Sequence, residues 1–109
     1  MLKFDHNPSE KTVTCFFTGR LDTNATISIS DELSDTLKRL IVSDDPSALP
    51  EGKIVFDMKG VNYIASSFIR ICVSTAKQVN RGSFSIINCE PFLKKTFKIA
   101  GLDELLTIK

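Results

Sequence analysis

Short apolar runs separated by polar turns mark the beginning of the chain. Leu2 to His6 and Thr12 to Thr18 read as two short strands, and the second is rich in β-branched and aromatic residues, as β-strands are. The segment Asn7-Pro8-Ser9-Glu10 lies between them, and its Asn and Pro favour a turn. The pattern therefore predicts an opening β-hairpin, and Gly19 permits a sharp exit from the second strand into a helix.

A helical pattern follows from about Asn24 to Val42. Apolar residues recur there at spacings that place them on one face of a helix, namely Ile29, Leu33, Leu37, Leu40 and Ile41. Asp22 or Thr23 is expected to cap this helix. The next segment, Ser43 to Gly52, contains two prolines and a glycine, which predicts a surface loop.

The centre of the chain reads as a strand, a helix and a second strand. Lys53 to Asp57 is a nearly continuous apolar run, typical of a strand buried on both faces of an α/β sheet. Ser66 to Arg81 contains many β-branched residues, but its length, the possible N-caps Ser66 and Ser67, and Gly82 after it favour a helix. We expect four of its residues to face inward: Ile69, Cys72, Val73 and Ala76.

Ser83 to Asn88 alternates like a strand, which completes a βαβ unit with parallel strands and hence a mixed sheet. Pro91 suits the first turn of a final helix, and Gly101 suits its end. Leu93, Phe97 and Ala100 share one face of that helix. Leu102 to Ile108 is expected to add a closing turn and a short strand.

Composition narrows the possibilities without adding a site. The chain has 109 residues, is 42% hydrophobic and carries a formal charge of +1. These values favour one domain over residues 1–109 and argue against non-specific binding of nucleic acid. The N-terminal residues lack the apolar stretch of a signal peptide, and no run is long enough to insert into a membrane, so we expect a cytoplasmic protein. The three widely spaced cysteines are interpreted as buried thiols.

An enzyme finds little support in the sequence. The GxSxG elbow and the glycine-rich phosphate-binding motifs are absent, so the lone His6 has no visible serine to activate. Asp57 is interpreted as a local hydrogen-bond acceptor rather than a catalytic base. The final helix carries Lys94, Lys95 and Lys98, which are interpreted as a solvated face. We therefore expect no catalytic residue, no metal and no cofactor.

Three segments in order carry a resemblance to a known family. They are Gly19-Arg20-Leu21-Asp22, then Ile54-Val55-Phe56-Asp57-Met58-Lys59-Gly60-Val61, then Ala65-Ser66-Ser67-Phe68. Together they resemble the STAS domain family, which includes bacterial anti-sigma factor antagonists. The resemblance implies an α/β fold with a mixed four- to five-stranded sheet and about three to four helices. It also implies that Ser66, at the start of the second helix, matches the family's phosphorylated serine.

The resemblance further implies a partner for the chain. In family antagonists, an anti-sigma factor that is also an ATP- and magnesium-dependent serine kinase phosphorylates the serine, and a phosphatase reverses the mark. The unmodified antagonist binds that partner and frees a sigma factor. We accordingly expect Asp22, Ser66, Ser67 and Phe68 to contact the partner. This chain reads Ala65-Ser66-Ser67-Phe68 where the family has Asp-Ser-Ser/Thr-Gly.

Other interpretations remain open at these positions. Ser66 and Ser67 would also serve simply as helix caps. Phe68 would either anchor a partner or fold into the core. The altered motif also suits an unphosphorylated STAS subunit of a regulatory scaffold or a membrane-transport assembly, with the second helix as a constant docking face.

Overall fold

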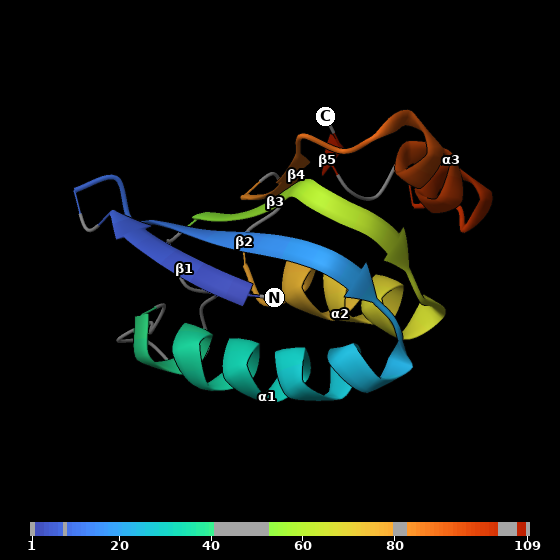
Figure 1. Cartoon of the computed structure of the whole chain (residues 1–109). Helices are drawn as coiled ribbons and strands as arrows, with labels where there is room; N and C mark the ends of the chain where they lie inside the picture. Colours follow the sequence, from blue (N-terminus) through green and yellow to red (C-terminus); the bar gives the residue numbers. More distant parts are fainter. Residues whose placement is uncertain (1, 8, 41–52, 80–82, 103–106, 109) are drawn as a thin grey trace.

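The described residues form a mixed β-sheet with helices packed against it (Figure 1). The computed structural model describes residues 2–7, 9–40, 53–79, 83–102 and 107–108. The elements in chain order are β1 (Leu2–Asn7), β2 (Thr12–Leu21), α1 (Thr23–Leu40), β3 (Lys53–Ile64), α2 (Ser66–Ala76), β4 (Phe84–Ile87), α3 (Pro91–Ile99) and β5 (Thr107–Ile108). The predicted loop over Ser43 to Gly52 and the helix-ending role of Gly82 lie outside the described residues.

The strands lie side by side in the order of the sequence, β1-β2-β3-β4-β5. β1 runs antiparallel to β2, which confirms the predicted hairpin. The pairs β2–β3, β3–β4 and β4–β5 are all parallel, and each pair is joined through a helix. This confirms the predicted α/β class and mixed sheet. α1 and α2 lie on one side of the sheet, whereas α3 lies apart from them (Figure 1).

The two central strands are longer than the sequence predicts. β2 continues through Gly19 to Leu21, so the glycine is not the exit from the strand. Gly19 instead has a positive φ of 88° and lies at one of two irregularities in the β2–β3 register. At each irregularity β3 contains one more residue than the paired part of β2, as in a β-bulge. β3 itself extends past Asp57 to Ile64.

The helices confirm the predicted types with shifted boundaries. α1 begins at Thr23 and α2 already ends at Ala76, before the expected Arg81. In α1 the predicted inward residues Ile29, Leu33 and Leu37 are buried. In α2 the most buried side chains are Phe68, Cys72 and Thr75, with Ile69, Val73 and Ala76 only half-buried. The buried face of α2 is therefore rotated about the helix axis toward Phe68, compared with the face that the sequence predicts.

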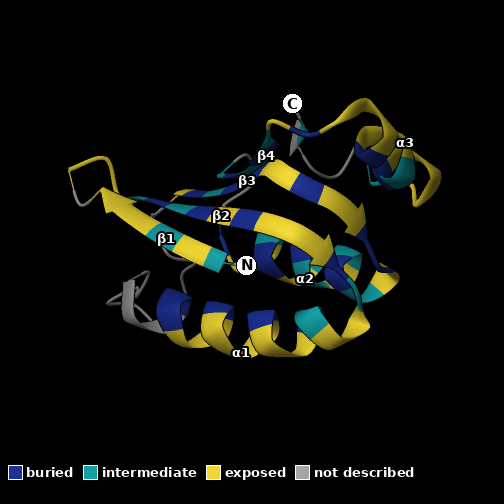
Figure 2. Ribbon diagram, viewed as in Figure 1, coloured by how far each residue is buried: buried dark blue, intermediate teal, exposed yellow. Residues whose placement is uncertain are grey.

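Aromatic rings form the centre of the core between the sheet and α2. The ring of Phe17 lies edge-on to those of Phe56 and Phe68, with centroids 4.8 and 5.1 Å apart, and Phe84 packs edge-on to Phe56 at 4.8 Å. Such pairs contribute about 0.5–1.5 kcal/mol each beyond their area burial. Buried residues of α1 face the sheet and exposed ones face away (Figure 2).

The final helix ends as the sequence predicts. Pro91 occupies its first turn, Leu93 and Phe97 are buried, and Ala100 is the exposed C-cap rather than a core residue. Gly101 follows with a φ of 78°. Its N–H donates to the carbonyl of Lys98, and the N–H of Leu102 donates to that of Phe97, the paired bonds of a Schellman motif.

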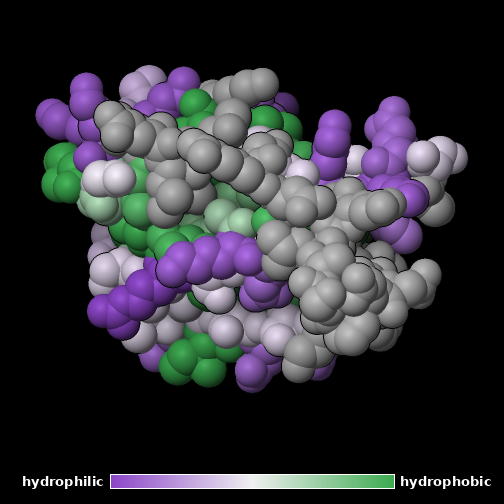
Figure 3. Space-filling view, turned by 180° about the vertical axis from the view of Figure 1, so that it is seen from behind, coloured by the Kyte–Doolittle hydropathy of each residue, from purple (hydrophilic) through white to green (hydrophobic). Residues whose placement is uncertain are grey.

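Figure 3 shows the molecule from behind, where both hydrophobic and hydrophilic side chains of the described residues reach the surface. Within the described residues, no helix combines the length and apolar character that a membrane span requires.

Candidate functional site

The register of the two central strands brings the beginnings of α1 and α2 together. Leu21 pairs with Ile64 at the end of both strands, and the backbone N–H of Ala65 donates to the carbonyl of Leu21 at 2.9 Å. Asp22 directly follows Leu21, and Ser66 directly follows Ala65. Asp22 and Ser66, at the starts of α1 and α2, are 44 positions apart in the sequence and meet at one edge of the sheet.

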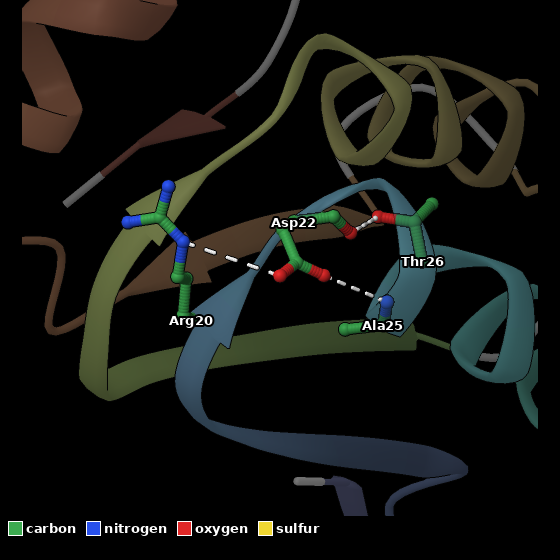
Figure 4. Close-up of polar contacts among 4 residues, drawn as sticks. All are labelled: Arg20, Asp22, Ala25 and Thr26. Atoms are coloured by element: carbon green, nitrogen blue, oxygen red, sulfur yellow. Dashed lines mark hydrogen bonds and ion pairs between the residues drawn. The ribbon is translucent and has the colours of Figure 1, made fainter.

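Asp22 caps the first helix, as the sequence predicts. Its Oδ1 accepts a hydrogen bond from the N–H of Ala25 at 2.9 Å, and its carbonyl accepts one from the hydroxyl of Thr26 at 2.7 Å (Figure 4). The second carboxylate oxygen, Oδ2, lies 4.0 Å from Nε of Arg20. One oxygen of Asp22 therefore stabilises α1, while the other faces the exposed side of the site.

Ser66 is exposed and begins α2. The N-cap of this helix is Ala65, with an extended backbone and no side-chain capping bond. The interpretation of Ser66 and Ser67 as N-caps is therefore wrong, because the chain enters the helix one residue earlier than that role requires. Ser66 is the first residue of the helix, where the backbone N–H groups lack intrahelical acceptors, as in any α-helix.

Ser67 occupies a different environment from its neighbour. The residue is half-buried, and its Oγ is shielded from solvent without a hydrogen bond to any part of the described chain. It lines an open hollow of about 330 Å³ between the first halves of α1 and α2. The other lining residues are Thr23, Thr26, Ile27, Ser30, Asp31 and Ile71.

Phe68 does not lie on the contact surface. Its side chain is fully buried and packs against Phe17 and Phe56, which corrects the prediction that it contacts a partner and agrees with the alternative of core burial. The helical periodicity explains the outcome, because a residue two positions after an exposed Ser66 points toward the sheet. Phe68 thereby holds the first turn of α2 against the core.

Asp57 acts as a local acceptor, as expected. Its carboxylate accepts hydrogen bonds from the backbone N–H of Lys59 at 3.0 Å and from the side-chain amide of Asn88 at 3.2 Å. The carboxylate lies within β3 rather than at the strand end, so it ties the central strand to the residue that follows β4.

The cysteines are buried free thiols, as predicted. Burial raises the pKa of Cys15 to about 12 and raises that of Cys72 well above the usual value. The pKa of Cys89 is also raised, mainly by burial, although Lys94 acts in the opposite direction. Thiols with raised pKa values are poor nucleophiles. In the part of the chain that the structure describes, no three His, Cys, Asp or Glu side chains gather as a metal site would require.

Sequence reasoning missed one pair of residues at this edge. The guanidinium of Arg20 lies 4.0 Å from the centroid of the Tyr63 ring, a cation–π arrangement. Arg20 and Tyr63 are register partners only because of the two irregularities between β2 and β3. Simple alternation along each strand does not reveal such a pairing.

A family model matches almost the whole chain. The model of the STAS domain covers residues 6–109. No curated protein sequence matches the chain.

Solved structures share the fold at low sequence identity. An anti-sigma factor antagonist from Mycobacterium paratuberculosis superposes with a TM-score of 0.77 at 13% identity, over 99% of this chain and 83% of that one. A STAS domain protein from Planctomyces limnophilus gives 0.72 at 18% identity, over 99% and 87%. The phosphorylated form of the Bacillus cell fate determinant SpoIIAA gives 0.67 at 17% identity, over 100% and 91%.

Proposed function

Because this chain belongs to the STAS domain family, we propose that it is a non-catalytic protein-binding module of the anti-sigma factor antagonist type. Its partner is an anti-sigma factor that is also a serine kinase, and Ser66 is the phosphorylated switch. Asp22, Ser66 and Ser67, at the adjoining starts of α1 and α2, form the contact site. The proposal places the protein in the bacterial cytoplasm, where a phosphatase would reverse the mark.

The exposure of Ser66 at the first position of α2 carries this proposal. A kinase requires a residue that solvent can reach, and Ser66 is exposed. Ser67 is less suited to modification because its Oγ is shielded. The solved phosphorylated SpoIIAA has the same fold, which supports the view that this fold accommodates a phosphate.

The start of a helix tolerates a phosphate in the modified protein. Unpaired N–H groups and the positive end of the helix dipole both favour negative charge there. In the first turn of α2 no acidic residue opposes the phosphate. A partner surface shaped for a neutral hydroxyl would instead meet a charge of about −2. The switch thus changes the interface and leaves the fold intact.

The experiment that tests this function uses Ser66 variants of the full chain. The purified protein is mixed with the serine-kinase anti-sigma factor of the source organism and ATP with magnesium, and phosphopeptides are mapped by mass spectrometry. We expect phosphate on Ser66 and none on Ser67. Binding by the unmodified protein should survive Ser66→Ala and be lost on Ser66→Asp.

Ser74 provides the matched control. It is exposed on the same helix, two turns after Ser66. Ser74→Asp introduces the same charge away from the site and should leave binding unchanged. Equal binding by Ser66→Asp and Ser66→Ala, together with no phosphate on Ser66, would remove the switch.

A second candidate function retains the site without the phosphate. Phe68 locks the first turn of α2 into the aromatic core, where the family pattern has glycine. A constant docking face of this kind suits a subunit of a regulatory scaffold or of a membrane-transport assembly. Recovery of a transporter ATPase or a multiprotein scaffold with the native protein, instead of a kinase, would favour this alternative.

A further inference from the structure

The sheet has a face turned away from α1 and α2, and its central part is open. Phe17 and Phe56 point toward α2, so their neighbours in the alternation point the other way. We call the resulting set the outer sheet patch, and it consists of Phe16, Thr18 and Arg20 on β2 with Gly60 and Tyr63 on β3. Exposed residues occupy this later part of both strands (Figure 2).

The middle of the outer sheet patch is shallow. Thr18 pairs with Gly60, which has no side chain to rise above the strand. A Cβ at Gly60 would lie 2.7 Å from Cγ2 of Thr18, so there is no room for a side chain at position 60 beside the threonine. Phe16 and Tyr63, which are 39% and 40% exposed, stand on either side of this low region. Such a surface accepts a segment laid across it.

Arg20 lies ready to bind at one end of the patch. Its guanidinium is stacked over Tyr63 at 4.0 Å, and its side chain remains 64% exposed. Only Nε faces Asp22, at 4.0 Å (Figure 4). Across the described residues, neither terminal nitrogen of Arg20 hydrogen-bonds to another group. A planar fork held by a ring and open to solvent has the geometry that binds a carboxylate through two parallel bonds.

We propose that the outer sheet patch is a second docking surface, which binds an acidic segment of a partner protein through a carboxylate on Arg20. Exposed Lys3 is the register neighbour of Phe16, and exposed Lys59 precedes Gly60, so cations flank the rings. Three carboxylates lie near these cations. Exposed Asp5 lies two residues after Lys3 on β1, and Asp22 is already engaged with Ala25. Asp57, the register partner of Phe16 on β3, is buried and accepts hydrogen bonds from Lys59 and Asn88.

A protein segment fits this surface better than a nucleic acid does. Three cations around two rings are too few to follow a phosphate backbone, and the chain as a whole is nearly neutral. Arg and Tyr are also the residues that most often dominate protein interfaces. The inference rests on the proposed protein-binding function, but it does not require Ser66 to be modified.

The test is an NMR titration of the full chain with a defined peptide. A peptide of alternating Glu and Gly is added at low salt, and the backbone amides and the Arg20 Nε–H are followed. Matched peptides with Gln or Lys in place of Glu, and inorganic phosphate, form the other arms. We expect saturable shifts at Arg20, Tyr63 and Phe16 with the Glu peptide only.

Variants separate recognition by Arg20 from general attraction of charge. Arg20→Gln should weaken binding of the Glu peptide about fivefold or more. The affinity of Arg20→Lys should lie between those of the native protein and Arg20→Gln, because lysine keeps the charge but lacks the planar guanidinium that binds through two parallel bonds. Arg70→Gln removes the same charge from an exposed position on α2 and should leave binding unchanged.

Four results would overturn this proposal: no shift at the patch, equal binding by Arg20→Gln and Arg70→Gln, shifts with phosphate equal to those with the Glu peptide, or shifts that follow protein concentration without peptide. The last would identify the patch as a contact between two copies of the chain. The Ser66 experiment is read by phosphopeptide mapping and by kinase binding of the Ser66 variants, so either proposal can fail while the other stands.

Discussion

The ring of Phe68 stands nearly perpendicular to that of Phe17, with an interplanar angle of 80° and centroids 5.1 Å apart. This contact joins the first turn of α2 to the middle of β2. It fixes the position of Ser66 without involving the serine itself. The exposed hydroxyl is therefore presented from a rigid base.

Removing this ring should loosen the whole site. Phe68 is fully buried, so Phe68→Ala is expected to lower the free energy of unfolding by about 3–5 kcal/mol. Urea denaturation followed by circular dichroism measures the loss. Phe68→Leu keeps much of the volume and should cost clearly less. Ile27 is 63% exposed, and Ile27→Ala serves as a control that should change stability little.

Asp22 should contribute to stability through its cap. Asp22→Ala removes the acceptor for the Ala25 N–H and is expected to destabilise the protein by about 1 kcal/mol. Asp22→Asn keeps a side-chain oxygen and should retain most of that stability while removing the negative charge next to Arg20. A partner that binds the native protein and Asp22→Asn equally well would show that the charge does not take part in recognition.

Much of this fold follows from local sequence patterns. The hairpin, the strand–helix–strand unit and the Pro91–Gly101 helix are set by turn residues, apolar spacing and length, all of which act over a few residues. The β-branched α2 was also predicted, because length and flanking residues outweigh propensity there. Asp22 or Thr23 was predicted as the cap of α1, and the structure shows Asp22 in that role.

The arrangement of the site was less accessible from the sequence. The two extra residues in β3 shift every later partner, so the meeting of Arg20 with Tyr63 depends on tertiary pairing. The entry into α2 at Ala65 rather than at a serine likewise contradicts capping preference. The aromatic cluster provides the reason, because burying Phe68 fixes where the helix begins.

Ser67→Ala should not weaken the protein. The Oγ of Ser67 is shielded and makes no hydrogen bond within the described residues, so its removal relieves an unpaired polar group. We expect stability to remain unchanged or to rise by up to about 1 kcal/mol, measured by urea denaturation. A loss of more than about 1 kcal/mol would reveal that the hydroxyl has a stabilising partner.

Alkaline pH should destabilise the protein through its buried thiols. Burial raises the pKa of Cys15 from 9.0 to about 12, and the folded state therefore keeps its proton where the unfolded chain has lost it. The stability that depends on this proton is fully present below pH 9 and is lost as the pH rises toward 12. We expect the urea midpoint to fall over this range, and to fall less steeply in Cys15→Ala.

Val13→Ala is the matched control for this slope. Val13 is fully buried on the same strand and does not titrate, so its truncation should lower stability by a similar packing loss at every pH. Every ionisable group other than Cys15 is shared by both variants. If Cys15→Ala retained the native slope, burial of this thiol would not be the source of the pH dependence. A shallower slope in Cys15→Ala alone would assign it to Cys15, because that variant alone removes a titrating group.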